Sequence, residues 1–207
     1  MAAGPAAKRP PQRALAAGAG AGGAGIGGSV GVSGRGLVGG GAAGGGVRAG
    51  ARQGSGQTGA LVELRPRRAP AEAVFHDEAG GEHRLAAFAG RGLVVNLWAT
   101  WCPPCVEEMP SLDRLAALVR EEGIEVLALS QDRGGAEAVR KFYARTGVRH
   151  LGVWLDPRGA AARAWGVRGL PTTIVIDRAG LEAARLEGAA DWAAPRMAER
   201  IRALAAP

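Results

Sequence analysis

The chain has 207 residues, a formal net charge of +7, and 47% hydrophobic residues. All 19 acidic residues lie after residue 60, whereas six of the 26 basic residues lie before it, so residues 61–207 carry 20 basic and 19 acidic side chains. The positive charge therefore belongs mostly to the N-terminal part, and it does not indicate a nucleic-acid-binding surface. The length allows one domain of about 150 residues with an appendage.

Residues 1–60 are rich in Gly and Ala and cannot build a packed core, because few side chains are large enough to offset the entropy of ordering the backbone. Lys8, Arg9 and Arg13 precede 21 uncharged residues at 14–34. This layout is typical of a signal or membrane-anchor segment, although its many glycines dilute the hydrophobicity. We expect export or anchoring through this segment, and the alternative is a disordered linker.

Residues 61–70, which contain Arg and Pro, are predicted to be a linker, and the folded domain is predicted to span 71–205. The domain begins with a small hairpin, in which residues 73–76 and 82–84 flank a Gly-containing turn. A helical turn at 85–88 follows. Residues 92–98 form an apolar run that predicts a buried strand.

The only two cysteines, Cys102 and Cys105, follow this strand and are separated by two prolines. Apolar residues recur at helical spacing after Pro104, which suits the first position of a helix. Cys102 therefore lies beside a helix N-terminus, where backbone N–H groups and the helix dipole favour a thiolate. We expect Cys102 to be the nucleophile and Cys105, one turn further, to resolve a mixed disulfide. A zinc site would need about four ligands, and the chain has no further cysteine.

The remaining pattern alternates between strands and helices, which predicts a largely parallel half of the sheet. The expected elements are strands at 125–130 and 152–155 and helices at 135–146 and 159–165. Pro171 opens a β-branched strand at 174–176, in a position where a cis peptide bond is common. An antiparallel partner strand at 181–186 and a last helix, capped by Asp191 and ending near residue 205, complete the chain.

Two motifs together resemble a known family. Trp101-Cys102-Pro103-Pro104-Cys105 follows a strand, and Gly169-Leu170-Pro171-Thr172-Thr173 leads a β-β-α ending. They resemble the thioredoxin fold in its TlpA/ResA/DsbE branch of membrane-anchored, extracytoplasmic thiol:disulfide reductases, over residues 70–205. The resemblance implies an α/β fold in which helices flank a central mixed sheet, with an N-terminal hairpin and a central strand–helix insert.

The resemblance also implies roles for individual residues. Asn96 stands where ordinary thioredoxins have a buried aspartate that assists proton transfer, so we expect Glu108 to handle protons or to tune the cysteine pair. The alternative is that Glu108 is a solvated carboxylate on the helix surface. Pro171 and its neighbour Leu170 are expected to bind an extended substrate segment.

We expect Trp101, Pro103 and Pro104 to line the substrate side of the dithiol. The predicted reaction is the reduction of disulfides in partner proteins, followed by re-reduction of the dithiol by a membrane electron donor. The resemblance suggests partners in cytochrome c or respiratory-oxidase copper-site maturation, on the periplasmic side of a bacterial inner membrane. We expect a monomer, with no metal, organic cofactor or nucleic-acid partner. The alternatives are a cytoplasmic thioredoxin-like reductase and a Sco-like copper chaperone.

Overall fold

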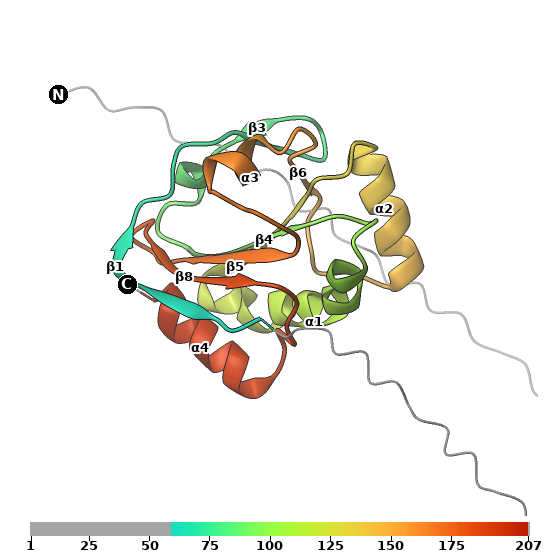
Figure 1. The fold of residues 1–207 in the computed structure, drawn as a ribbon. Helices are drawn as coiled ribbons and strands as arrows, with labels where there is room; N and C mark the ends of the chain where they lie inside the picture. Colours follow the sequence, from blue (N-terminus) through green and yellow to red (C-terminus); the bar gives the residue numbers. More distant parts are fainter. Residues whose placement is uncertain (1–58, 207) are drawn as a thin grey trace, which may run out of the picture. The chain divides into compact units, whose positions relative to one another are not determined.

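The computed structural model describes residues 59–206 (Figure 1). The predicted anchor at residues 14–34, and all but the last two residues of the Gly/Ala-rich segment at 1–60, lie outside the described residues. Within 59–206, no helix combines the length and the apolar character that crossing a membrane requires.

Eight strands form one mixed sheet in the order β1-β8-β7-β4-β5-β6-β2-β3. The strands are β1 (Val62–Arg68), β2 (Phe75–Asp77), β3 (Glu82–His83), β4 (Gly92–Trp98), β5 (Ile124–Ser130), β6 (Trp154–Leu155), β7 (Thr172–Ile176) and β8 (Glu182–Glu187). The helices are α1 (Pro103–Val119), α2 (Gly135–Thr146), α3 (Ala160–Ala164) and α4 (Pro195–Ala205), with short 3-10 helices η1 (Leu85–Phe88) and η2 (Arg120–Glu122). The sheet therefore has the predicted mixed character, including the β2–β3 hairpin.

Strand β4 lies in the middle of the sheet, and all seven of its residues are buried. It pairs in parallel with β5 and antiparallel with β7. Such a strand is covered on both faces, and this explains why its sequence is a nearly continuous apolar run rather than an alternating one. Because β4 leads directly into α1, its burial fixes the place where the two cysteines stand (Figure 1).

Each face of the sheet has its own apolar core. Val94 and Trp98 of β4 belong to the cluster that contains the buried residues of α1, α2 and α4. Leu93 and Leu97 point to the opposite face and pack with residues of α3 and with Phe75. The alternation along β4 follows from the two-residue period of a strand. Helices α1 and α4 lie side by side under the sheet (Figure 1).

The segment predicted as a linker is different in the structure. Residues 62–68 form β1, which pairs antiparallel with β8 at the edge of the sheet. Pro66 and the arginines suggested a loop, but an edge strand tolerates both proline and charged side chains because one side of its backbone needs no partner. The ordered region therefore begins before residue 71.

Two predicted helix starts are also wrong. Helix α1 begins at Pro103, one residue before the predicted Pro104, so Cys102 itself is the N-cap residue. Helix α4 begins at Pro195 with Ala194 as its N-cap, and Asp191 does not cap it. Proline at the first helical position provides a start signal stronger than the aspartate four residues earlier.

Candidate active site

The two cysteines form a disulfide at the start of α1, with 5.3 Å between their Cα atoms. Cys102 is 5% exposed, and Cys105 is fully buried. Pro103 and Pro104 have no N–H, so the first backbone donors of the helix are those of Cys105 and Val106, and Val106 donates to the Cys102 carbonyl oxygen at 3.1 Å. Cys102, the more accessible cysteine, thus stands at the N-terminal end of α1, which favours a thiolate there once the disulfide is reduced.

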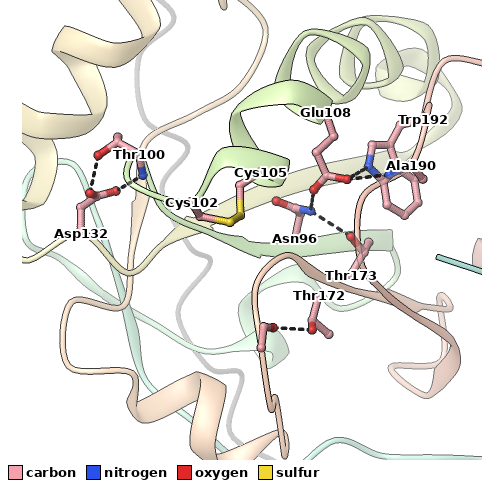
Figure 2. The surroundings of a disulfide bond; sticks show 11 residues. Asn96, Thr100, Cys102, Cys105, Glu108, Asp132, Thr172, Thr173, Ala190 and Trp192 are labelled. Carbon is pink, nitrogen blue, oxygen red and sulfur yellow. Dashed lines mark hydrogen bonds between the residues drawn. A yellow bond between two sulfur atoms is a disulfide. The ribbon is translucent and has the colours of Figure 1, made fainter. Parts of the chain in front are cut away.

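A buried carboxylate lies one turn beyond the disulfide. Glu108 is 3% exposed, and three donors from two segments, β4 and the β8–α4 connection, hold it. Asn96 Nδ2 donates to Glu108 Oε1 at 2.7 Å, while the backbone N–H of Ala190 and Trp192 Nε1 donate to Oε2 at 3.0 and 2.8 Å. Figure 2 shows the carboxylate turned toward Asn96 and the 190–192 segment. Glu108 is therefore not the solvated surface carboxylate that we considered as an alternative.

Burial controls the protonation of this group. Removal from water raises the pKa of Glu108 from its ordinary 4.5 to about 7, even though the hydrogen bonds from Trp192, Asn96 and Ala190 lower it. A carboxyl group with a pKa near neutrality can both accept and return a proton under physiological conditions. No basic side chain donates to it among the described residues, so its three partners are neutral.

The hydrogen bond from Trp192 was not predicted from the sequence, in which this residue indicated simple packing. Its indole is fully buried, and Nε1 donates to Glu108 across 84 residues of sequence. A single tryptophan in an apolar pattern carries no signal for such a partner. Trp192 and Glu108 come together only because the β8–α4 connection packs against α1 in the folded protein.

A second buried carboxylate, Asp132, holds the loop that precedes the cysteines. It accepts hydrogen bonds from the Thr100 N–H at 2.9 Å and from Thr100 Oγ1 at 2.6 Å (Figure 2). Ser130 Oγ donates a third at 2.8 Å. This residue was not predicted from the sequence either. Its position just after β5 was a usable signal, because the carboxyl ends of neighbouring parallel strands meet at the same edge of a sheet.

The predicted substrate-side residues lie around the same end of the sheet. The side chain of Trp101 is 66% exposed, whereas Pro171 is buried and follows Leu170 through a cis peptide bond. Thr172 pairs with Leu97 of β4, so Pro171 stands near the strand end that leads to Cys102. Pro103 is exposed, and Pro104 and Leu170 are half-buried.

A cavity of the described region lies away from the dithiol, and residues 59–206 offer no metal site. A cavity of about 290 Å³ opens beside Leu93 and Ile176, near the end of β4 opposite to the cysteines. Across residues 59–206, no three His, Cys, Asp or Glu side chains gather as a group that could hold a metal ion.

Comparisons with known proteins agree with this geometry. The family model described as Redoxin matches residues 67–196. The thiol-disulfide oxidoreductase ResA of Geobacillus thermodenitrificans is 37% identical over 107 residues, which cover 52% of this chain and 60% of the relative. ResA of Bacillus thuringiensis subsp. konkukian is 34% identical over 115 residues, covering 56% and 65%. The chain thus spans roughly 60% of the length of these curated relatives.

Solved structures are similar over most of the described region. A candidate thiol:disulfide interchange protein DsbE from Chlorobium tepidum has 25% identity and a TM-score of 0.55, covering 67% of this chain and 94% of that one. A second Chlorobium tepidum protein of the thioredoxin family, with 23% identity and a TM-score of 0.53, covers 68% and 99%.

A mixed sheet flanked by helices, with a cysteine pair at the start of the helix that follows its central strand, defines a thioredoxin-like fold, as the sequence motifs predicted. Within this class, the chain belongs to the Redoxin family.

The raised pKa of Glu108 predicts a specific dependence of stability on pH. Between pH 4.5 and pH 7 the folded protein retains a proton that the unfolded chain has lost, so the free energy of unfolding falls as pH rises through this window. At about 1.36 kcal/mol per pH unit, the loss is about 3 kcal/mol. The test compares the free energies of unfolding of Glu108→Gln and wild type, both in the disulfide form, by urea unfolding at pH 5 and pH 8. Because only wild type loses stability through this window, the difference should shift by about 3 kcal/mol in favour of Glu108→Gln from pH 5 to pH 8.

The exposed neighbour Glu107 supplies the control, because Glu107→Gln makes the same chemical change on the surface of the same helix. A constant difference between Glu108→Gln and wild type at pH 5 and pH 8 would contradict the assignment.

Trp192 should tune the same carboxyl group. Trp192→Phe keeps an aromatic ring but removes the Nε1–H donor, so the pKa of Glu108 should rise above its wild-type value of about 7. The carboxyl infrared band, followed against pH, measures this change. Trp98→Phe is the matched control, because Trp98 Nε1 has no hydrogen-bond partner within residues 59–206. An unchanged or lowered pKa in Trp192→Phe would refute the role of the indole.

Proposed function

We propose that this protein is a thiol:disulfide oxidoreductase that reduces disulfides in partner proteins. The observation that carries the proposal is the cysteine pair at the N-terminus of α1 with the buried carboxyl group of Glu108 one turn further along the same helix. Similarity to curated proteins named thiol-disulfide oxidoreductase ResA supports the same activity.

In the proposed reaction, the Cys102 thiolate attacks one sulfur of a partner disulfide. The Cys102–partner bond forms as the partner's own S–S bond breaks, and one partner thiolate leaves. Cys105 then gives its thiol proton to the Glu108 carboxylate and attacks the Cys102 sulfur. The Cys102–Cys105 disulfide forms, the second partner thiolate leaves, and the two electrons have moved from this protein to the partner. A dithiol donor restores the reduced form by the reverse exchange.

Proton transfer from Cys105 to Glu108 is supported by position and by pKa. The two residues are three apart on α1, a spacing that places side chains on one face of a helix. A carboxyl group with a pKa of about 7 is ionised in a large fraction of molecules near neutral pH, and it can return the proton when the pair is reduced again.

We assign the substrate surface to the residues around the exposed side of Cys102. Trp101 supplies a large exposed aromatic face, Pro103 and Pro104 follow the nucleophile, and Leu170 with Pro171 flanks the neighbouring strand end. An extended segment of a partner protein that carries its disulfide across this surface would bring a sulfur to Cys102.

We further propose that the partners are proteins whose thiols must be reduced for cytochrome c or oxidase copper-site maturation. The resemblance of the two sequence motifs to the TlpA/ResA/DsbE branch suggests this class of partner, and the curated relatives are named thiol-disulfide oxidoreductases. Selectivity of this kind is needed where structural disulfides abound, because an unselective reductase would break them.

Trapping tests the proposed function. Cys102→Ser should abolish reduction of a disulfide-bonded model protein such as insulin. Cys105→Ser should still make the first attack and accumulate a mixed disulfide through Cys102, visible by mass spectrometry. Glu108→Gln should slow turnover roughly 100-fold or more, because general acid–base groups typically contribute about 10²- to 10⁴-fold. Turnover at the wild-type rate in Cys102→Ser would refute the proposal.

We place the domain outside the cytoplasm, and three basic residues before the uncharged stretch at 14–34 support this location. A membrane-impermeant maleimide tests it in whole cells after mild reduction. Cys102 should be labelled without lysis, whereas labelling only after lysis would indicate a cytoplasmic protein.

A further inference from the structure

The amide of Asn96 is only half satisfied in the disulfide form. Its side chain is fully buried in the middle of the sheet. Nδ2 donates both of its hydrogens, one to Glu108 Oε1 at 2.7 Å and one to Thr173 Oγ1 at 2.9 Å. Oδ1 is buried, and no atom of residues 59–206 donates a hydrogen bond to it.

The orientation of this amide is set by its two hydrogen bonds. The nitrogen of Asn96 faces Glu108 Oε1 and Thr173 Oγ1, so its oxygen faces away from both. Figure 2 shows Oδ1 on the side of the amide that is turned toward the disulfide. The unpaired acceptor therefore points to the sulfurs and not to the rest of the network.

Reduction of the disulfide changes the donors available at this place. Sulfur atoms in a disulfide carry no hydrogen, whereas a thiol is a weak hydrogen-bond donor. Cys105 is the fully buried member of the pair, so its thiol cannot find water as easily as that of Cys102. A buried carbonyl oxygen without a partner is unfavourable, and a new S–H nearby relieves this deficit.

We propose that Asn96 Oδ1 accepts a hydrogen bond from the Cys105 thiol in the reduced protein, so that Asn96 is a positioning residue between Cys105 and Glu108. This inference rests on the proposed function in assuming that the pair is reduced in the working cycle. It gives Asn96 a part that differs from that of an aspartate, because an amide holds a proton donor in place without taking its proton.

The bond keeps the two thiols different. An acceptor bonded to the neutral S–H favours the protonated form of Cys105, while the helix N-terminus favours the thiolate of Cys102. When Cys102 is joined to a partner, the S–H bond of Cys105 breaks, its proton goes to Glu108, and the released thiolate attacks Cys102 as the partner thiolate leaves. Asn96 holds Cys105 and Glu108 together for this transfer.

Three elements present polar groups to the amide of Asn96. Helix α1 presents the cysteines and Glu108, strand β7 presents Thr173, and the β8–α4 connection presents Trp192 behind the carboxylate. Of these groups only the two cysteines gain a hydrogen when the disulfide is reduced. A new donor that appears beside Oδ1 on reduction therefore comes from the cysteine pair.

The S–H stretching band in the infrared spectrum tests the bond directly. Cys102→Ser leaves Cys105 as the only thiol of the full-length chain, and a hydrogen-bonded thiol absorbs at lower frequency than a free one. We expect the band to move to higher frequency when Asn96→Leu is added, because leucine keeps the approximate volume but has no acceptor. Adding Thr173→Val instead should leave the band in place, because it removes a partner of Nδ2 and not the acceptor.

An identical band in Cys102→Ser with and without Asn96→Leu would overturn the proposal. If the leucine variant does not fold, Cys102→Ser alone decides, since a band at the frequency of a thiol in apolar solvent would also overturn it. The measurement involves no substrate. Lack of turnover in the wild-type protein would therefore refute the proposed function without affecting the band.

Discussion

Glu108 is a carboxylate taken out of water and held by three neutral donors, and the arrangement of the site depends on this contact. The donors come from β4, from the backbone after β8, and from the indole of Trp192, so the central strand, the cysteine helix and the C-terminal connection all meet at one side chain. Burial of an acidic group without a cation is unfavourable when the group is ionised. This buried carboxyl group lies beside the only two cysteines of the chain. A proton acceptor with a pKa near 7 has a chemical use at that place.

Strand β4 and Asp132 hold the chain that leads to the dithiol. Strand β4 is buried on both faces and carries Asn96 in its middle, and Asp132 fixes the loop between β4 and Cys102 through Thr100. Reactive groups mounted on such a scaffold need little reorganisation during exchange. The hydrogen bonds of Glu108 are buried, whereas Trp101 is exposed to a partner.

Local patterns in the sequence predicted the elements whose causes are local. The apolar run of β4 and the helix at 135–146, which ends at a glycine with φ 76°, were predicted with the bounds that the structure has. The cysteine pair and its place at a strand-to-helix turn were also predicted, because the apolar strand, the cysteines and the prolines that start the helix are neighbours in the sequence.

Contacts between residues far apart in the sequence could not be predicted from any local pattern. The edge strand β1 is ordered by pairing with β8, more than 100 residues later, and its own composition favours a loop. Trp192 belongs to the site only because the β8–α4 connection folds back onto α1. Glu108 was predicted from family resemblance, whereas its hydrogen-bond partners lie on β4, 12 residues away, and on the β8–α4 connection, more than 80 residues away.

The central claim is that Cys102 and Cys105 exchange between disulfide and dithiol as a two-electron couple. Equilibration of the purified protein in a series of glutathione redox buffers, followed by acid quenching, alkylation and mass spectrometry, measures this directly. We expect one transition in which both cysteines become alkylated together, with the slope of a two-electron reaction. A pair that stays fully oxidised or fully alkylated across the whole range of cellular poises would contradict it.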